Sequence, residues 1–290
     1  MPPSSRPPGI RSKHLKDETP GHFAWAVPVM RAGYAGRGLV YLLVAGASLR
    51  SIWNGGDAEG TGEAMGRLQG LPGTAVLVLI ALGMFAYAAW RAVDSIWDLE
   101  DYGNAPKGLI ARAGMMTTGL VHLGLGLLTV TVLLGRSEGL GGTGLVNRLL
   151  AATAGQAAIG TAGALTLGAG GYYLHKAWTE GYRSHLKGNP ATLHLNLVLK
   201  AGMAAHGAVI GIIGLLMLRT AAYASSRQAG GIGTALDWLQ DRTYGQLLVT
   251  LLCLGLLGFA LVCFVNAAWR IVPKADDRGI RSLKDMLTAP

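Results

Sequence analysis

Six polar side chains lie within or beside long apolar stretches, where charged and hydrogen-bonding groups are costly and need a reason. They are Arg37, Asp94, His122, His175, His206 and Asn266. Arginine offers a fixed positive charge for an anion, and histidine exchanges protons near neutral pH. Two histidines can also ligate a b-type haem between helices. These six residues are therefore the candidate functional residues.

Arg37 lies about two turns inside its apolar stretch and has two interpretations. Its side chain either binds an anionic substrate or serves structure, by reaching the membrane surface or by pairing with Asp94. We favour the structural role. Asn266 is expected to hydrogen-bond a neighbouring helix.

The three histidines also have several interpretations. Interhelical hydrogen bonds that fix packing are favoured for His122, His175 and His206. A proton relay is the first alternative, and haem on a histidine pair is the second. No other cofactor is predicted.

The sequence contains no motif of a known catalytic or metal site. It has no GxxxxGK[ST] loop, no HExxH and no CxxC, and no GxSxG in a strand-to-helix context. Two acidic loops could in principle bind a divalent cation, but a solvated face is favoured for both. They contain Asp57, Glu59 and Glu63, and Asp98, Glu100 and Asp101. We predict no catalytic residue, no metal site and no enzymatic activity.

The composition indicates a membrane protein. Charged residues make up only 14% of the 290 residues, hydrophobic residues 51%, and glycine alone occurs 44 times. Several apolar stretches exceed about 18 residues, the length of a membrane-spanning helix. The net charge of +9 does not indicate nucleic-acid binding, because the cations flank the apolar stretches as topology signals do.

The chain repeats one pattern three times. A cation followed by Ala-Gly opens an apolar stretch at Arg31, Arg112 and Lys200. In this alignment Arg37 and His206 share one position. We predict three units, 22–104, 105–190 and 191–273, between a disordered tail at 1–21 and an amphipathic cytoplasmic tail at 274–290.

Each unit is expected to contain two spans that form a helical hairpin. The predicted spans are Ala32–Ile52, Pro72–Val93, Ala113–Gly135, Gln156–Trp178, Ala201–Ala222 and Gln246–Val272. Short interfacial helices are predicted within 61–71, 143–154 and 234–244. Lys and Arg concentrate on the side of the termini, so both termini are expected in the cytoplasm. The predicted fold is an all-α membrane protein with three parallel hairpin repeats around a pseudo-threefold axis.

The repeated pattern resembles a bacterial integral membrane family, domain of unknown function 1206. The resemblance rests on residues 31–41, on Gly119-Leu120-Val121-His122, and on residues 244–248 that open the last span. It implies three tandem two-helix repeats in a bacterial plasma membrane, and no established reaction.

Three functions remain open from the sequence. A non-enzymatic interaction or assembly component is favoured, because glycine-rich stretches suit close helix packing. The first alternative is passage of a small solute or ion along the axis, lined by Arg37, His122 and His206. The second is a haem-binding redox protein. The expected partners are the lipid bilayer and either other proteins or further copies of this chain.

Overall fold

Six long helices form the body of the protein in a computed structural model that describes residues 23–68, 70–135, 150–152, 154–223, 231–273 and 282–288. They are α1 (Ala26–Trp53), α3 (Gly70–Trp97), α4 (Pro106–Leu133), α6 (Gly155–Trp178), α8 (Asn196–Tyr223) and α10 (Gly245–Trp269). Each predicted span falls on one of them. The described residues contain no strand, only isolated bridges such as Leu186 with Arg270.

Four of these helices, α3, α4, α8 and α10, are long and apolar enough to cross a membrane. The other two are similarly long, 28 residues in α1 and 24 in α6. Their hydropathy is lower because α1 contains three arginines and α6 is rich in glycine and alanine. The helices therefore indicate a membrane protein, while six spans and cytoplasmic termini stay predictions.

Shorter helices lie between the long ones. α2 (Thr61–Gly66) and α9 (Ile232–Gln240) overlap two of the predicted interfacial segments. Most of the third segment, 143–154, and the whole tail 1–21 fall outside the described residues. α7 (Pro190–His194) follows the 3-10 turn η1 (Gly181–His185), and α11 (Leu283–Thr288) lies in the predicted carboxyl-terminal tail.

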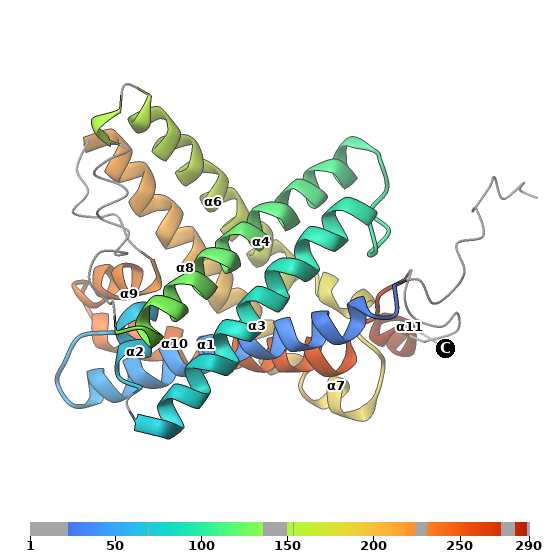
Figure 1. Ribbon diagram of the computed structural model, residues 1–290, viewed down its shortest axis with the longest axis horizontal. Helices are drawn as coiled ribbons and strands as arrows, with labels where there is room; N and C mark the ends of the chain where they lie inside the picture. Colours follow the sequence, from blue (N-terminus) through green and yellow to red (C-terminus); the bar gives the residue numbers. More distant parts are fainter. Residues whose placement is uncertain are drawn as a thin grey trace, which may run out of the picture.

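The long helices pack in the spatial order α4, α3, α1, α10, α8, α6. In Figure 1, α1 and α10 run side by side, while the α3–α4 pair and the α6–α8 pair cross one another. The expected hairpin contact occurs in the first unit, between α1 and α3, and in the third, between α8 and α10. In the second unit, α4 packs on α3 and α6 packs on α8, with no comparable contact between α4 and α6.

Glycines set these close approaches. A Cβ added to Gly36 on α1 would lie 2.5 Å from the Cα of Gly83 on α3. A Cβ on Gly170 of α6 would lie 2.6 Å from the backbone nitrogen of Gly211 on α8. Only glycine allows backbones so near, and the proximity maximises van der Waals contact where lipid gives no hydrophobic driving force. The α6–α8 contact is the most extensive between any two helices of the described residues, and α6 therefore packs on α8 and not on α4.

Candidate functional site

Arg37 is buried where all six long helices meet. The surrounding group, called the Arg37 cluster below, takes residues from each helix. It comprises Arg37 and Tyr41 on α1, Tyr87 on α3, His122 on α4, Tyr173 on α6, His206 on α8 and Phe259 on α10. Arg37 is only 5% exposed, so its side chain does not reach the membrane surface and that structural interpretation is not supported.

The Arg37 guanidinium donates to two neutral groups. Nη1 lies 3.0 Å from the Tyr87 hydroxyl, and Nη2 lies 3.1 Å from Nε2 of His206. Arginine can only donate, so His206 Nε2 accepts and its Nδ1 carries the hydrogen. The guanidinium carbon also lies 5.1 Å from the Phe259 ring centre, within range of a cation–π attraction. No ion pair joins Arg37 to a carboxylate among the described residues.

Two donors of the cluster are buried without partners in the described part of the chain. They are Nε of Arg37 and Nδ1 of His206. A buried donor without an acceptor costs about 1–3 kcal/mol, and more when the group is charged. A ligand with acceptor atoms would recover this cost, so the cluster suits an anion.

Aromatic rings hold His206 in place. Its ring stacks on Phe259 with centres 3.8 Å apart and planes 11° apart. Tyr41 and Tyr173 approach it edge-on, at 5.2 and 4.8 Å. The ring therefore has little freedom to turn, and the direction of its Nε2 toward Arg37 is fixed.

An ionic network continues from the cluster toward the end of α3. The Tyr87 hydroxyl also accepts from Arg91 Nε at 3.1 Å, and Arg91 Nη1 pairs with Asp94 at 3.3 Å. Glu100 lies 3.9 Å from Arg91 and accepts from Arg270 at 2.6 Å. Burial would raise the pKa of Glu100, but the guanidiniums of Arg270 and Arg91 outweigh burial and lower the pKa to about 2.

This network corrects several predictions. Asp94 pairs with Arg91 and not with Arg37. Asn266 donates to the carbonyl of Val262 on its own helix and accepts from Arg270 just after that helix, because both lie four residues away along the chain. His175 lies on the exposed side of α6 and outside the cluster.

In the acidic loop after α3, Asp101 is exposed as predicted, but the other two acids are buried. Glu100 is 5% exposed and Asp98 is 8% exposed. Asp98 accepts from the backbone amides of Tyr102 and Gly103, which closes the loop on itself. The described residues contain no group of three or more His, Cys, Asp or Glu that could hold a metal ion.

The haem interpretation does not fit the histidine geometry. Nε2 of His206 is taken by Arg37, and Phe259 covers one face of the ring. Nδ1 of His122 lies 2.7 Å from the carbonyl oxygen of Thr118, and its ring packs against Tyr87. A haem iron between the two would require both rings to leave these contacts.

Sequence reasoning missed Arg91, Glu100 and Arg270 as interior residues. Arg91 lies eight residues after Gly83, as Lys176 lies eight after Gly168, and this shared position was the available signal. Arg270 lies near the end of the last apolar stretch, where a cation is expected as a topology signal. Glu100 gave no signal, because a loop acid beside other acids is usually solvated.

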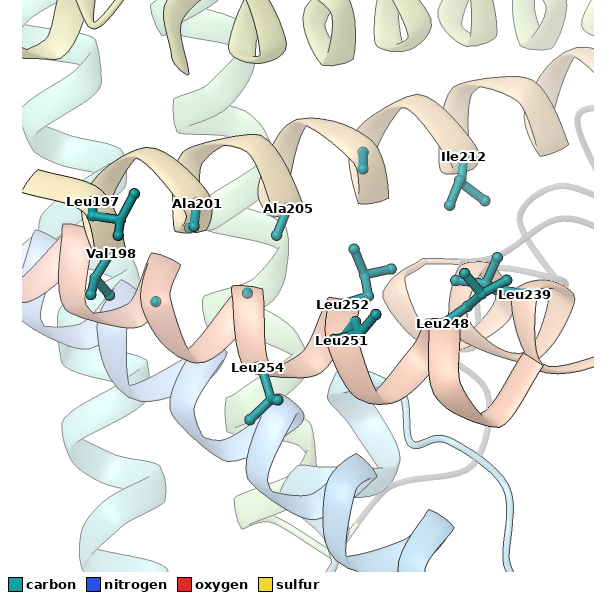
Figure 2. A pocket seen from close by; sticks show the side chains of 14 residues that line it. Leu197, Val198, Ala201, Ala205, Ile212, Leu239, Leu248, Leu251, Leu252 and Leu254 are labelled. Carbon is teal, nitrogen blue, oxygen red and sulfur yellow. The ribbon is translucent and has the colours of Figure 1, made fainter. Parts of the chain in front are cut away.

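A separate groove of about 660 Å³ lies between α8 and α10 and carries no polar chemistry. Figure 2 shows Ala201 and Ala205 on α8 facing α10, with Leu252 of α10 pointing toward α8. Such a lining suits hydrocarbon chains of a lipid. We therefore place the candidate site at the Arg37 cluster.

Comparison with known proteins supports the repeat organisation. The chain is 24% identical over 268 residues to "Uncharacterized protein YxxB" of Bacillus subtilis (strain 168), an alignment that covers 88% of this chain and 94% of that protein. No solved structure matches the chain. The model of the family described as Domain of Unknown Function (DUF1206) matches residues 32–98, 113–180 and 201–270, one region in each repeat unit. These matches span most of the sequence, and the chain therefore belongs to the DUF1206 family.

Proposed function

We propose that this protein binds a small anion at Arg37 and lets it pass through the membrane along the axis between the six helices. The observation that carries the proposal is a buried guanidinium that has only neutral hydrogen-bond partners, Tyr87 and His206. A charge removed from water costs several kcal/mol unless an opposite charge offsets it. A bound anion supplies that opposite charge.

The charge balance of the connected network supports the same function. The chain of contacts from Arg37 contains three positive groups, Arg37, Arg91 and Arg270, and two negative groups, Asp94 and Glu100. Arg91 and Arg270 are matched by the two carboxylates. One positive charge is left over, and it is that of Arg37.

The residues that come together around Arg37 favour passage of an anion over a purely structural assembly role. Arg37, His122 and His206 are the side chains that the passage hypothesis requires around one axis. Arg37 contacts His206 directly, and Tyr87 links it to His122. The glycines that suggested assembly are largely used for packing within this chain, as between Gly36 and Gly83.

The protein is proposed to be non-enzymatic and to reside in a bacterial plasma membrane, with both termini in the cytoplasm. Four strongly apolar helices and the relative from Bacillus subtilis support the location. The concentration of Lys and Arg near the helix ends on the side of the termini supports the orientation.

Anion binding is tested with purified protein in detergent. Thermal unfolding is measured in sodium chloride, nitrate and formate, each against sodium gluconate at equal ionic strength. A ligand at about 100 times its Kd adds about 2.7 kcal/mol of stability. At least one small anion should raise Tm in the native protein and not in Arg37→Gln. The matched control is Arg31→Gln, an exposed arginine on the same helix, which should respond like the native protein.

Passage is tested by efflux of the same anions from proteoliposomes. The native protein and Arg31→Gln should release the anion that stabilises them, and Arg37→Gln should release it at least tenfold more slowly. Equal Tm values in all salts, or equal efflux from Arg37→Gln and the native protein, would contradict the proposal.

A further inference from the structure

Helix packing in the first repeat unit uses two contacts. A Cβ on Gly33 of α1 would lie 2.6 Å from the Cα of Tyr87 on α3. A Cβ on Gly36 would lie 2.5 Å from the Cα of Gly83. These contacts join α1 to α3 directly beside Arg37.

The third unit repeats both contacts at the equivalent positions. Gly202 on α8 abuts the backbone at Phe259 on α10, and a Cβ on Gly255 would meet the Cβ of Ala205. Two units of three thus pack their helices through the same four positions, so the contact is a property of the repeat.

The second unit has residues that permit the same contacts and does not make them. The equivalent residues are Gly114 and Thr117 on α4, and Gly168 and Tyr172 on α6. A Cβ on Gly114 or on Gly168 would meet nothing within 4 Å. Thr117 is exposed, and Tyr172 is 55% exposed although its counterparts Tyr87 and Phe259 are buried. Among the described residues, the two helices of the second unit, α4 and α6, are therefore not packed on each other at these positions.

We propose that α4 and α6 form a lateral gate, which closes when Gly114 packs against Tyr172 and Thr117 packs against Gly168. In the closed state, α4 thus covers the exposed face of α6, and α6 covers that of α4. In this closure α4 stays packed on α3 and α6 stays packed on α8, and the two pairs come together at α4 and α6. Packed helix interfaces favour discrete arrangements, so the gate has an open and a closed state.

The gate acts on the Arg37 cluster because each of its helices carries one member. His122 on α4 packs on Tyr87, and Tyr173 on α6 packs on His206. In the open structure these contacts already cover Arg37, which is 5% exposed, and closure presses both residues further toward its guanidinium. The role as a gate rests on the proposed anion function, whereas the closure itself does not.

Closure is tested by a disulfide between Thr117→Cys and Gly168→Cys in native membranes treated with a mild oxidant. Both positions are open in this structure, so the substitutions disturb no packing. The positive control is the equivalent pair that is already in contact, Ala205→Cys with Gly255→Cys, where the two Cβ atoms would lie 2.4 Å apart and α8 and α10 must separate by about 1 Å to form the disulfide. The native cysteines Cys253 and Cys263 are buried, and each single-cysteine variant controls for their reaction.

The expected result is an intramolecular disulfide in both pairs, identified by mass spectrometry of peptides from α4 and α6. A disulfide in the control pair alone would overturn the closure. A disulfide between two chains at Thr117 and Gly168 would also overturn it, because a second copy would then occupy the seam.

The gating role is read from anion efflux before and after reduction of the disulfide. We expect efflux at least tenfold slower in the oxidised double variant, with recovery on reduction. Unchanged efflux in a cross-linked protein would overturn gating and leave closure standing. Absence of efflux in the native protein would refute the proposed function, and the cross-linking result would still decide closure.

Discussion

Arg37 and His206 occupy the same position in the first and third repeat units, and their side chains meet, with Nη2 of Arg37 3.1 Å from Nε2 of His206. Two equivalent positions of the repeat are thus in direct contact. The equivalent residue of the second unit, Thr118, instead bonds the carbonyl of Gly114 on its own helix. The same repeat position therefore carries a guanidinium in the first unit, a hydroxyl in the second and an imidazole in the third, and the three groups make different contacts.

This contact fixes the tautomer of His206. Because the guanidinium cannot accept a hydrogen bond, the hydrogen of the neutral ring must be on Nδ1. Nitrogen-15 NMR of histidine-labelled protein should show one neutral histidine protonated at Nδ1 that is absent from His206→Gln. A signal for His206 protonated at Nε2 alone would contradict the contact.

Arg37 and Arg91 should respond oppositely to removal of their charge. Arg37→Met removes a buried charge that has no carboxylate partner, so in gluconate we expect unchanged or higher stability. Arg91→Met leaves Asp94 and Glu100 short of a partner and should cost about 3–5 kcal/mol. Chemical or thermal unfolding in detergent measures both. Equal losses would indicate that Arg37 is a structural residue.

Two glycines at one repeat position make a matched pair for packing. Gly33→Ala places a methyl group 2.6 Å from the Cα of Tyr87, so we expect overpacking that costs about 1–3 kcal/mol. Gly114→Ala meets nothing within 4 Å and should be neutral or stabilising by up to about 1 kcal/mol, through helix propensity. Unfolding in detergent separates them, and a loss at Gly114 as large as at Gly33 would mean that α4 and α6 are already packed.

The long helices could be predicted from sequence because their apolar length and repeated glycines are local properties. The repeat also carries an aromatic residue four positions after Gly83 and Gly255, at Tyr87 and Phe259. It did not predict that the second unit would be open. Each helix of that unit packs on a neighbouring unit, and the relative strength of those contacts depends on several helices at once.

The site was predicted only in part, for a similar reason. Sequence showed that Arg37 and His206 are equivalent, but equivalence does not state that they touch. The pairing of Asp94 with Arg91, three residues away, was available from helical spacing alone. The contact between Glu100 and Arg270 spans 170 residues and depends on how the loop after α3 folds against the end of α10.

His185 should make the protein sensitive to mild acid. It lies outside the long helices, and burial followed by the charge of Arg270 lowers its pKa from 6.5 to about 4. The folded state therefore favours the neutral ring. Its contribution to stability is present above pH 6.5 and is lost as the pH falls toward 4. In His185→Gln, the decline in Tm between pH 6.5 and 4 should be smaller than in the native protein. An unchanged decline would assign it to other groups.

Glu100 should affect the stability of the protein at a lower pH than His185 does. Its pKa is lowered from 4.5 to about 2, so its stabilising contribution is present above pH 4.5 and is lost as the pH falls toward 2. That difference corresponds to about 3 kcal/mol at neutral pH. We expect Glu100→Gln to lower stability at pH 7 by about this amount, because Arg270 is left buried without its partner.

A double-mutant cycle with Arg270→Gln tests whether the loss at Glu100 arises from this pair. Glu100→Gln and Arg270→Gln together should cost less than the sum of the two single changes, since neither then leaves the other charge uncompensated. Glu59→Gln is the matched control, because Glu59 is also buried and pairs with Arg67 at 2.8 Å in the loop before α3. It should show no coupling to Arg270→Gln. Additive losses at Glu100 and Arg270 would show that the stability of this end of the protein does not depend on their contact.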